Sequence, residues 1–245
     1  MITNWLILPV LAILFLATLI RSAFGFGEAL VSVPLLALII PIEVAAPVAV
    51  LVSITVAAIV LVQDWQEVHF GSASRLVLSS MAGIPFGLLL LTMIAEPIVK
   101  AVLAAIIIIF SVHSLMNRNQ HKLKDDGWAW LFGFGSGILG GAYGMNGPPL
   151  VVYGALRRWS PQHFRATLQG YFLPASILVM AGYWFAGLWT PAVTRYYLLA
   201  LPIVILAIFG GRLINRRINE ERFLLYIHAA LILIGIILLT LAVFP

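Results

Sequence analysis

Cysteine is absent from the sequence, and only 9% of its 245 residues carry a charged side chain. The absence of cysteine excludes disulfide bonds and thiol chemistry. The shortage of charge excludes an ordinary soluble domain, because even a well-packed core leaves a large polar exterior. Hydrophobic residues make up 62% of the chain and its mean hydropathy is +1.09, which indicates an apolar surface that faces lipid.

Motifs of catalysis and nucleic-acid binding are also missing. There is no GxSxG or Walker A pattern, and the five histidines form no HxxH or HxxxH pair beside a carboxylate cluster. We therefore expect no catalytic residues, no metal, no cofactor and no enzymatic activity. The formal net charge is +5, but the basic residues fill the gaps between apolar runs and are not interleaved with aromatic residues, which excludes nucleic acid as a partner.

Long apolar runs are what the chain does contain, for example Ala101–Phe110 and Leu231–Phe244. A membrane barrel would show short segments of alternating polarity, so these runs favour helices. We predict an all-α polytopic membrane protein in which the first two segments of each half are short and separated by a glycine-rich break. The ten predicted segments are residues 5–20, 28–40, 46–62, 76–94, 98–115, 128–140, 145–156, 166–184, 194–211 and 223–244.

The positions of the basic residues predict the orientation of the chain. If each short pair crosses the membrane an even number of times, twelve of the fourteen Lys and Arg residues fall in gaps on one side, Arg21 and Arg165 among them. The positive-inside rule makes that side cytoplasmic and places both termini in the periplasm. Two short crossings and a re-entrant hairpin give the same loop sides, so both arrangements remain open for each short pair.

A weak internal similarity predicts two repeats within a single membrane domain. Ala23–Gly25 matches Ala142–Gly144 at an offset of 119 residues. Each half holds about five segments, an odd number, so the second repeat (residues 121–245) should be inverted relative to the first (residues 1–120). Inverted repeats with interrupted helices in matching positions are typical of secondary transporters.

The two glycine-rich breaks, Arg21–Glu28 and Gly140–Pro149, are the candidate binding site. We expect positive φ angles at Gly144 and Gly147, where a β-branched residue would not fit, and a helix start at Pro148. A helix start offers free N–H groups and a partial positive charge, which suit an anion. The two breaks are expected to converge near the bilayer midplane. Close helix packing is the alternative role of these glycines.

Few polar residues lie near the breaks, and each has two interpretations. Glu28 is a candidate for proton coupling or a simple helix cap. Arg165 either attracts the anion or anchors its helix at the cytoplasmic boundary, and Asn146 either binds the anion or ties up the loop backbone. The candidate substrate-binding residues are Gly25, Phe26, Gly27, Ser53, Gly144, Met145, Asn146, Gly147, Arg165, Thr167 and Gln169.

Two sequence motifs resemble those of a known family. The first begins Gly25-Phe-Gly-x-x-Leu and continues to Pro34-Leu-Leu; the second includes Gly144-x-x-Gly-Pro-Pro-Leu and is followed by Arg165-Ala-Thr. They are similar to motifs of the sulfite exporter TauE/SafE family of bacterial membrane permeases, from about residue 10 to residue 240. Glu28 departs from the pattern, since the family often has another glycine there. The resemblance implies transport of sulfite, sulfonates or related small anions in the bacterial inner membrane.

Together these features predict a secondary transporter of a small anion (sulfite, a sulfonate, or a related oxyanion or organic acid) that works by alternating access. Its partners would be the anion, the lipid bilayer and a coupling proton or sodium ion. A passive anion channel and a membrane-embedded assembly factor or enzyme remain alternatives, and the last would need a clustered histidine or carboxylate site. The oligomeric state is left open.

Overall fold

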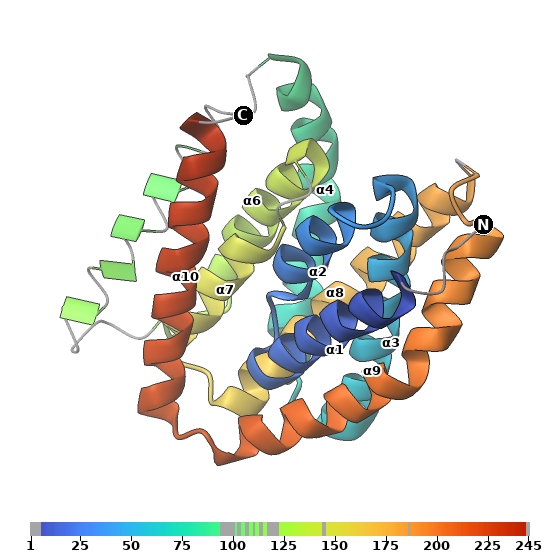
Figure 1. Cartoon of the computed structure of the whole chain (residues 1–245). Helices are drawn as coiled ribbons and strands as arrows, with labels where there is room; N and C mark the ends of the chain where they lie inside the picture. Colours follow the sequence, from blue (N-terminus) through green and yellow to red (C-terminus); the bar gives the residue numbers. More distant parts are fainter. Residues whose placement is uncertain are drawn as a thin grey trace. The chain divides into compact units, whose positions relative to one another are not determined.

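The computed structural model describes residues 6–93, 123–143, 146–185 and 187–243, with scattered positions between 101 and 116. All regular secondary structure in these residues is helical (Figure 1). The helices are α1 (Ile7–Phe24), α2 (Glu28–Ala37), α3 (Ile42–Asp64), the short 3₁₀ helix η2 (Trp65–Glu67), α4 (Phe70–Met93), α6 (Trp128–Tyr143), α7 (Gly147–Arg157), α8 (Pro161–Phe185), α9 (Pro191–Arg217) and α10 (Glu220–Val243).

Nine of the ten predicted segments correspond to these helices, and the fifth, residues 98–115, lies largely outside the described residues. Several predicted ends need correction, and two of them bear on the site. Arg21 and Arg165 were assigned to gaps between segments, but Arg21 lies in the last turn of α1 and Arg165 in the second turn of α8. Both side chains are buried and paired with a carboxylate, so hydropathy alone ended the first segment too early and began the eighth too late.

Several helices suit a bilayer. Within the described residues, three spans are long and apolar enough to cross a membrane: Ile7–Phe24, Glu43–Glu67 and Pro191–Arg217. Large apolar side chains are exposed on many helices, including Leu8, Val62 and Phe185, which are 76%, 80% and 88% exposed. Such extensive apolar exposure is unfavourable in water and suits contact with lipid.

The chain forms two compact units, and each combines segments from both halves of the sequence. The first unit contains residues 1–70 and 161–217, and the second contains residues 71–160 and 218–245. The first unit therefore holds α1, α2, α3, η2, α8 and α9, whereas the second holds α4, α6, α7 and α10.

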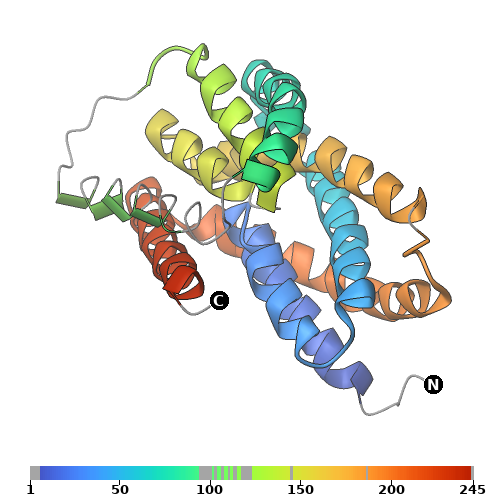
Figure 2. The ribbon, with the colours of Figure 1, turned by 90° about the horizontal axis from the view of Figure 1, so that it is seen from above.

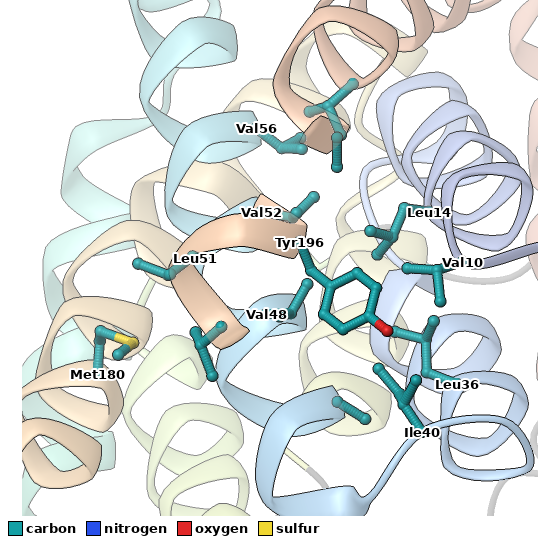
Figure 3. Packing of buried hydrophobic residues seen from close by; sticks show 14 of the residues in the cluster. Val10, Leu14, Leu36, Ile40, Val48, Leu51, Val52, Val56, Met180 and Tyr196 are labelled. Carbon is teal, nitrogen blue, oxygen red and sulfur yellow. The ribbon is translucent and has the colours of Figure 1, made fainter. Parts of the chain in front are cut away.

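In the first unit, α1 and α2 lie side by side (Figures 1 and 2), and both pack against α3. The long helices α8 and α9 complete the unit by packing on α3 and α1. Figure 3 shows the hydrophobic core that joins these helices, with the Tyr196 ring of α9 among Val10 and Leu14 of α1 and Leu36 of α2.

Gly211 allows a close crossing of α9 and α1 in the first unit. A Cβ atom on Gly211 of α9 would lie 2.8 Å from the backbone carbonyl carbon of Ser22 and 2.9 Å from the nitrogen of Ala23, both on α1. Small residues at such crossings let two membrane helices approach closely. Ser22 adds a polar contact, because its hydroxyl donates a 2.7 Å hydrogen bond to the carbonyl of Ile208.

Replacing Gly211 with alanine should therefore separate α1 from α9 and destabilise the protein by about 1–3 kcal/mol, the usual cost of overpacking. Gly182→Ala on α8 is the matched control, since a Cβ there meets no atom within 4 Å. Thermal unfolding in detergent measures both variants. Equal midpoints for the two would contradict the assigned close approach.

The second unit contains the other helical hairpin, α6 and α7, with α10 packed on α7. Glycines again set a close crossing: a Cβ on Gly137 of α6 would lie 2.7 Å from Cα of Ser80 on α4. The loop before α6 is held by Asp126, which accepts hydrogen bonds from Ser72 (2.8 Å) and pairs with Arg157 (2.7 Å). The buried Tyr153 hydroxyl lies 3.4 Å from the same carboxylate.

Candidate functional site

The first break is a short left-handed turn between α1 and α2. Gly25 ends α1 with φ of +89°, and its N–H donates to the carbonyl of Arg21 over 2.6 Å. Gly27 precedes α2 with φ of +97°. Only glycine adopts such angles without strain, so the predicted glycine-dependent break is confirmed here. Phe26, between the two glycines, is buried with its ring edge-on to Phe164 at 6.3 Å.

Arg21 is the central residue of this break. It is 5% exposed, and its guanidinium pairs with the carboxylate of Glu28 through Nη1 and Oε2. The same Nη1 donates to the hydroxyl of Ser53 at 2.6 Å. Nε and Nη2 donate to the side-chain carbonyl of Gln169 at 3.0 and 2.8 Å. The planar fork of arginine thus joins α1 to α2, α3 and α8 in one buried polar cluster.

Neutral groups complete the surroundings of the guanidinium. The Ser53 hydroxyl lies 2.8 Å from that of Ser176 on α8, and the guanidinium carbon lies 5.0 Å from the ring centroid of Phe172. Gln169 is held in place because its amide N–H donates to the carbonyl of Gly25 at 2.9 Å. Gln169 therefore contacts both Arg21 and the backbone of the break.

Glu28 is the ion-pair partner of Arg21 and not a helix cap. It is the first residue of α2, the N-cap is Gly27, and no side chain makes a capping hydrogen bond there. Glu28 is 2% exposed, and its second oxygen, Oε1, has no hydrogen-bond partner among the described residues. A carboxylate oxygen without a partner is unusual inside a protein and marks a place where a proton or another donor can bind.

Backbone donors lie beside this ion pair. The first hydrogen bond within α2 runs from the N–H of Val31 to the carbonyl of Gly27, so the amides that precede Val31 have no partner in the helix. A helix N-terminus carries about half a positive charge and attracts anions. The break therefore combines a guanidinium, free amides and side-chain hydrogen-bond groups.

Arg165 and Thr167 belong to a neighbouring network. Arg165, 1% exposed, pairs with Asp64 at the end of α3, and its Nη2 donates to the Ser22 hydroxyl at 3.1 Å. Arg212 of α9 pairs with the same carboxylate. The Thr167 hydroxyl accepts the backbone N–H of His69 at 3.0 Å. These contacts hold α1, α3, α8 and α9 together around the break and leave Arg165 fully engaged with protein groups.

Two histidines that are distant in the sequence also meet near η2. The rings of His69 and His163 stack edge-on at 4.7 Å, and His163 pairs with Glu67. This proximity was not visible from histidine spacing. The described residues nevertheless contain no group of three or more side chains arranged to hold a metal ion.

The second break lies in the second unit. Here α6 ends at Tyr143 and α7 begins at Gly147, with Pro148 in its first turn, as predicted from the prolines. Gly144 and Met145 lie outside the described residues. The backbone carbonyl of Asn146 accepts a 2.6 Å hydrogen bond from Ser136, and its side chain makes no capping bond.

The expectation of a positive φ at Gly147 is wrong. Positive φ angles occur at Gly25, Gly27 and Gly187 among the described glycines, while Gly147 is the first residue of a regular helix. A Cβ atom on Gly147 would meet no atom within 4 Å. The prolines that follow set the helix start there, so a left-handed residue is not needed.

The residues that sequence reasoning missed are Arg21, Ser176, Phe172 and Asp64. A helical pattern on α8 contains part of the signal, because Arg165, Gln169, Phe172 and Ser176 follow one another by four, three and four residues and so share a face. Arg21 and Glu28 lie seven residues apart across the break. Asp64 offered no such signal, since its partners come from distant helices.

Apolar helices of membrane-spanning length around a buried ion pair define the chain as a polytopic helical membrane protein. The family model of the sulfite exporter TauE/SafE family matches residues 10–238, nearly the whole chain, and the chain therefore belongs to this family. The family is one of membrane transport proteins, so the chain is a permease and not an enzyme. No curated protein and no solved structure matches it significantly.

Replacing Gly25 with alanine should lower the free energy of unfolding of the protein by about 1–3 kcal/mol, because φ of +89° is strained for alanine. The new Cβ would also lie 3.0 Å from Cα of Arg165. Gly147→Ala is the matched control and should be tolerated, since its position is helical and open. Thermal unfolding of the two purified variants tests this, and a stable Gly25→Ala protein would refute the assigned geometry.

Proposed function

We propose that this permease is a secondary transporter of a small anion, such as sulfite, a sulfonate or a related oxyanion or organic acid, and that the first break binds the anion. The observation that carries the proposal is the buried guanidinium of Arg21, in the last turn of α1, which contacts Glu28 at the start of α2 as well as Ser53 and Gln169. A cation inside a membrane protein is costly and usually serves function. A guanidinium suits oxyanions because its N–H groups match their oxygens in pairs.

The site residues divide by role. Arg21, Ser53 and Gln169 would bind the anion together with the backbone of Gly25–Gly27. Phe26 would shield the break from lipid, and Arg165 and Thr167 would hold the helices that carry the ligands. Gly144, Met145, Asn146 and Gly147 at the second break stay candidate ligands, on the strength of the helix start there.

Alternating access between two inverted repeats, residues 1–120 and 121–245, is the proposed mode of transport. Helix starts support the repeat, because α1, α2, α3 and α4 are followed about 120 residues later by α6, α7, α8 and α9. The glycine crossings support it too: α1 meets α9 at Gly211, and α6 meets α4 at Gly137. These two helix pairs correspond to each other under the repeat.

We expect coupling to an ion gradient, with a proton or sodium ion as the coupling ion and Glu28 as the candidate proton carrier. Two features of Glu28 support that choice: it pairs with Arg21, and its Oε1 has no hydrogen-bond partner among the described residues. A buried carboxylate that gains and loses a proton is a common coupling device in membrane transporters.

The function test uses purified protein in proteoliposomes with sulfite and methanesulfonate as substrates. Arg21→Lys keeps the charge but loses the planar fork, so flux should fall at least about tenfold. Arg21→Gln should abolish flux. Arg217→Gln removes an exposed arginine from the end of α9 and is the charge-matched control, with flux expected to be unchanged. Wild-type flux in correctly inserted Arg21→Lys and Arg21→Gln proteins would remove Arg21 from the site.

The proposed location is the inner membrane with both termini in the periplasm. Setting aside the buried Arg21 and Arg165 leaves ten basic residues on the predicted cytoplasmic side and two on the other. A phosphatase fused after Pro245 should be active, and a cytoplasmic fluorescent reporter at the same position should be dark. The opposite pair of results would invert the topology.

A further inference from the structure

We infer that the permease carries a monovalent oxyanion together with one proton, without net charge movement, because the Glu28 carboxylate occupies the place on Arg21 that the substrate must take. The inference rests on the proposed function and deepens it. It assigns the charge of the substrate and the number of coupled protons.

The charges at the site balance. Arg21 and Glu28 are the two charged residues of α1 and α2, and both are buried. The groups that contact Arg21 from α3 and α8 are the neutral Ser53, Gln169 and Phe172. The sequence of the second break, Gly140–Pro149, contains no charged residue. One positive and one negative charge therefore balance here.

Other charged groups on the helices of this unit pair with one another or are exposed. On α3, Asp64 is shared by Arg165 of α8 and by Arg212 and Arg216 of α9. The remaining acid of α3, Glu43, is exposed in its first turn, and His163 of α8 pairs with Glu67. Among the described residues none of these groups pairs with Glu28, and Arg21 alone balances its charge.

An added anion would upset this charge balance. If an oxyanion joined Arg21 while Glu28 stayed ionised, the buried site would hold two negative charges against one positive charge. An uncompensated charge in an apolar interior is strongly unfavourable. A proton on Glu28 converts its carboxylate to a neutral acid and restores the balance. The anion and the proton therefore enter together, and both leave on the other side as Glu28 returns to Arg21.

The same charge balance limits the charge of the substrate. Glu28 is itself a monovalent oxyanion attached to the chain, and it shows which charge this guanidinium neutralises. A monoanion such as a sulfonate or bisulfite gives a neutral site once Glu28 is protonated. A dianion such as sulfate leaves one negative charge unbalanced even then. The site therefore selects against doubly charged oxyanions.

The test compares methanesulfonate and sulfate, which present similar oxygens but carry one and two charges. Wild-type protein in proteoliposomes is given a pH gradient or, with valinomycin and potassium, a membrane potential. A pH gradient should drive methanesulfonate uphill, the potential alone should have no effect, and sulfate flux should be at least about tenfold lower. Potential-driven methanesulfonate flux at equal pH, or comparable sulfate flux, would overturn the inference while leaving the transporter assignment intact.

Variants of Glu28 locate the proton. Glu28→Gln keeps the shape without an ionisable group, so its methanesulfonate flux should ignore the pH gradient and follow the membrane potential. Glu28→Asp keeps the carboxylate and should keep proton coupling. Glu43→Gln is the matched control and should behave like wild type. Proton coupling that survives in Glu28→Gln contradicts the inference; if that variant does not insert, the wild-type and Glu28→Asp measurements decide. Absence of any methanesulfonate or sulfite flux in wild type would overturn the proposed function as well.

Discussion

A guanidinium cannot stay unpaired inside an apolar protein, and the first unit is arranged around that constraint. Arg21 lies in the last turn of α1, where the left-handed Gly25 reverses the chain and Gly27 brings Glu28 back towards it. The helices α3 and α8 add only neutral side chains to the surroundings of Arg21, namely Ser53, Gln169 and Phe172. The ion pair explains why two left-handed glycines form the break, since they bring Glu28 to Arg21. It also explains the polar face of α8, which supplies a hydrogen-bond acceptor for the guanidinium.

Hydropathy and glycine patterning were enough to predict the helices and the two breaks. Helical content follows from long apolar runs, because backbone groups in lipid must bond within their own segment. The left-handed turn at Gly25 and the helix start at Gly147 likewise follow from local chemistry. Local rules also explain the failure at Gly147, where proline sets a helix start without any need for a positive φ.

The polar contacts of the buried arginines could not be predicted from local sequence patterns. Arg21 meets Gln169 across 148 positions and Arg165 meets Asp64 across 101, so no window of sequence contains both partners. A positively charged residue next to an apolar run was therefore assigned to a loop. Glu28 was singled out correctly as unusual, but its partner was not identified, although both belong to the same break. The structure shows two separate polar networks, one around Arg21 and Glu28 and one around Arg165 and Asp64, which the sequence did not distinguish.

The central claim is that an anion replaces Glu28 on Arg21 and that a proton accompanies it. Isothermal titration of methanesulfonate into the purified protein, repeated in buffers of different ionisation enthalpy, counts the protons taken up on binding. The account predicts an uptake that approaches one proton per anion bound at a pH where Glu28 is ionised in the empty protein. Binding of the anion with no proton uptake at any pH would contradict it.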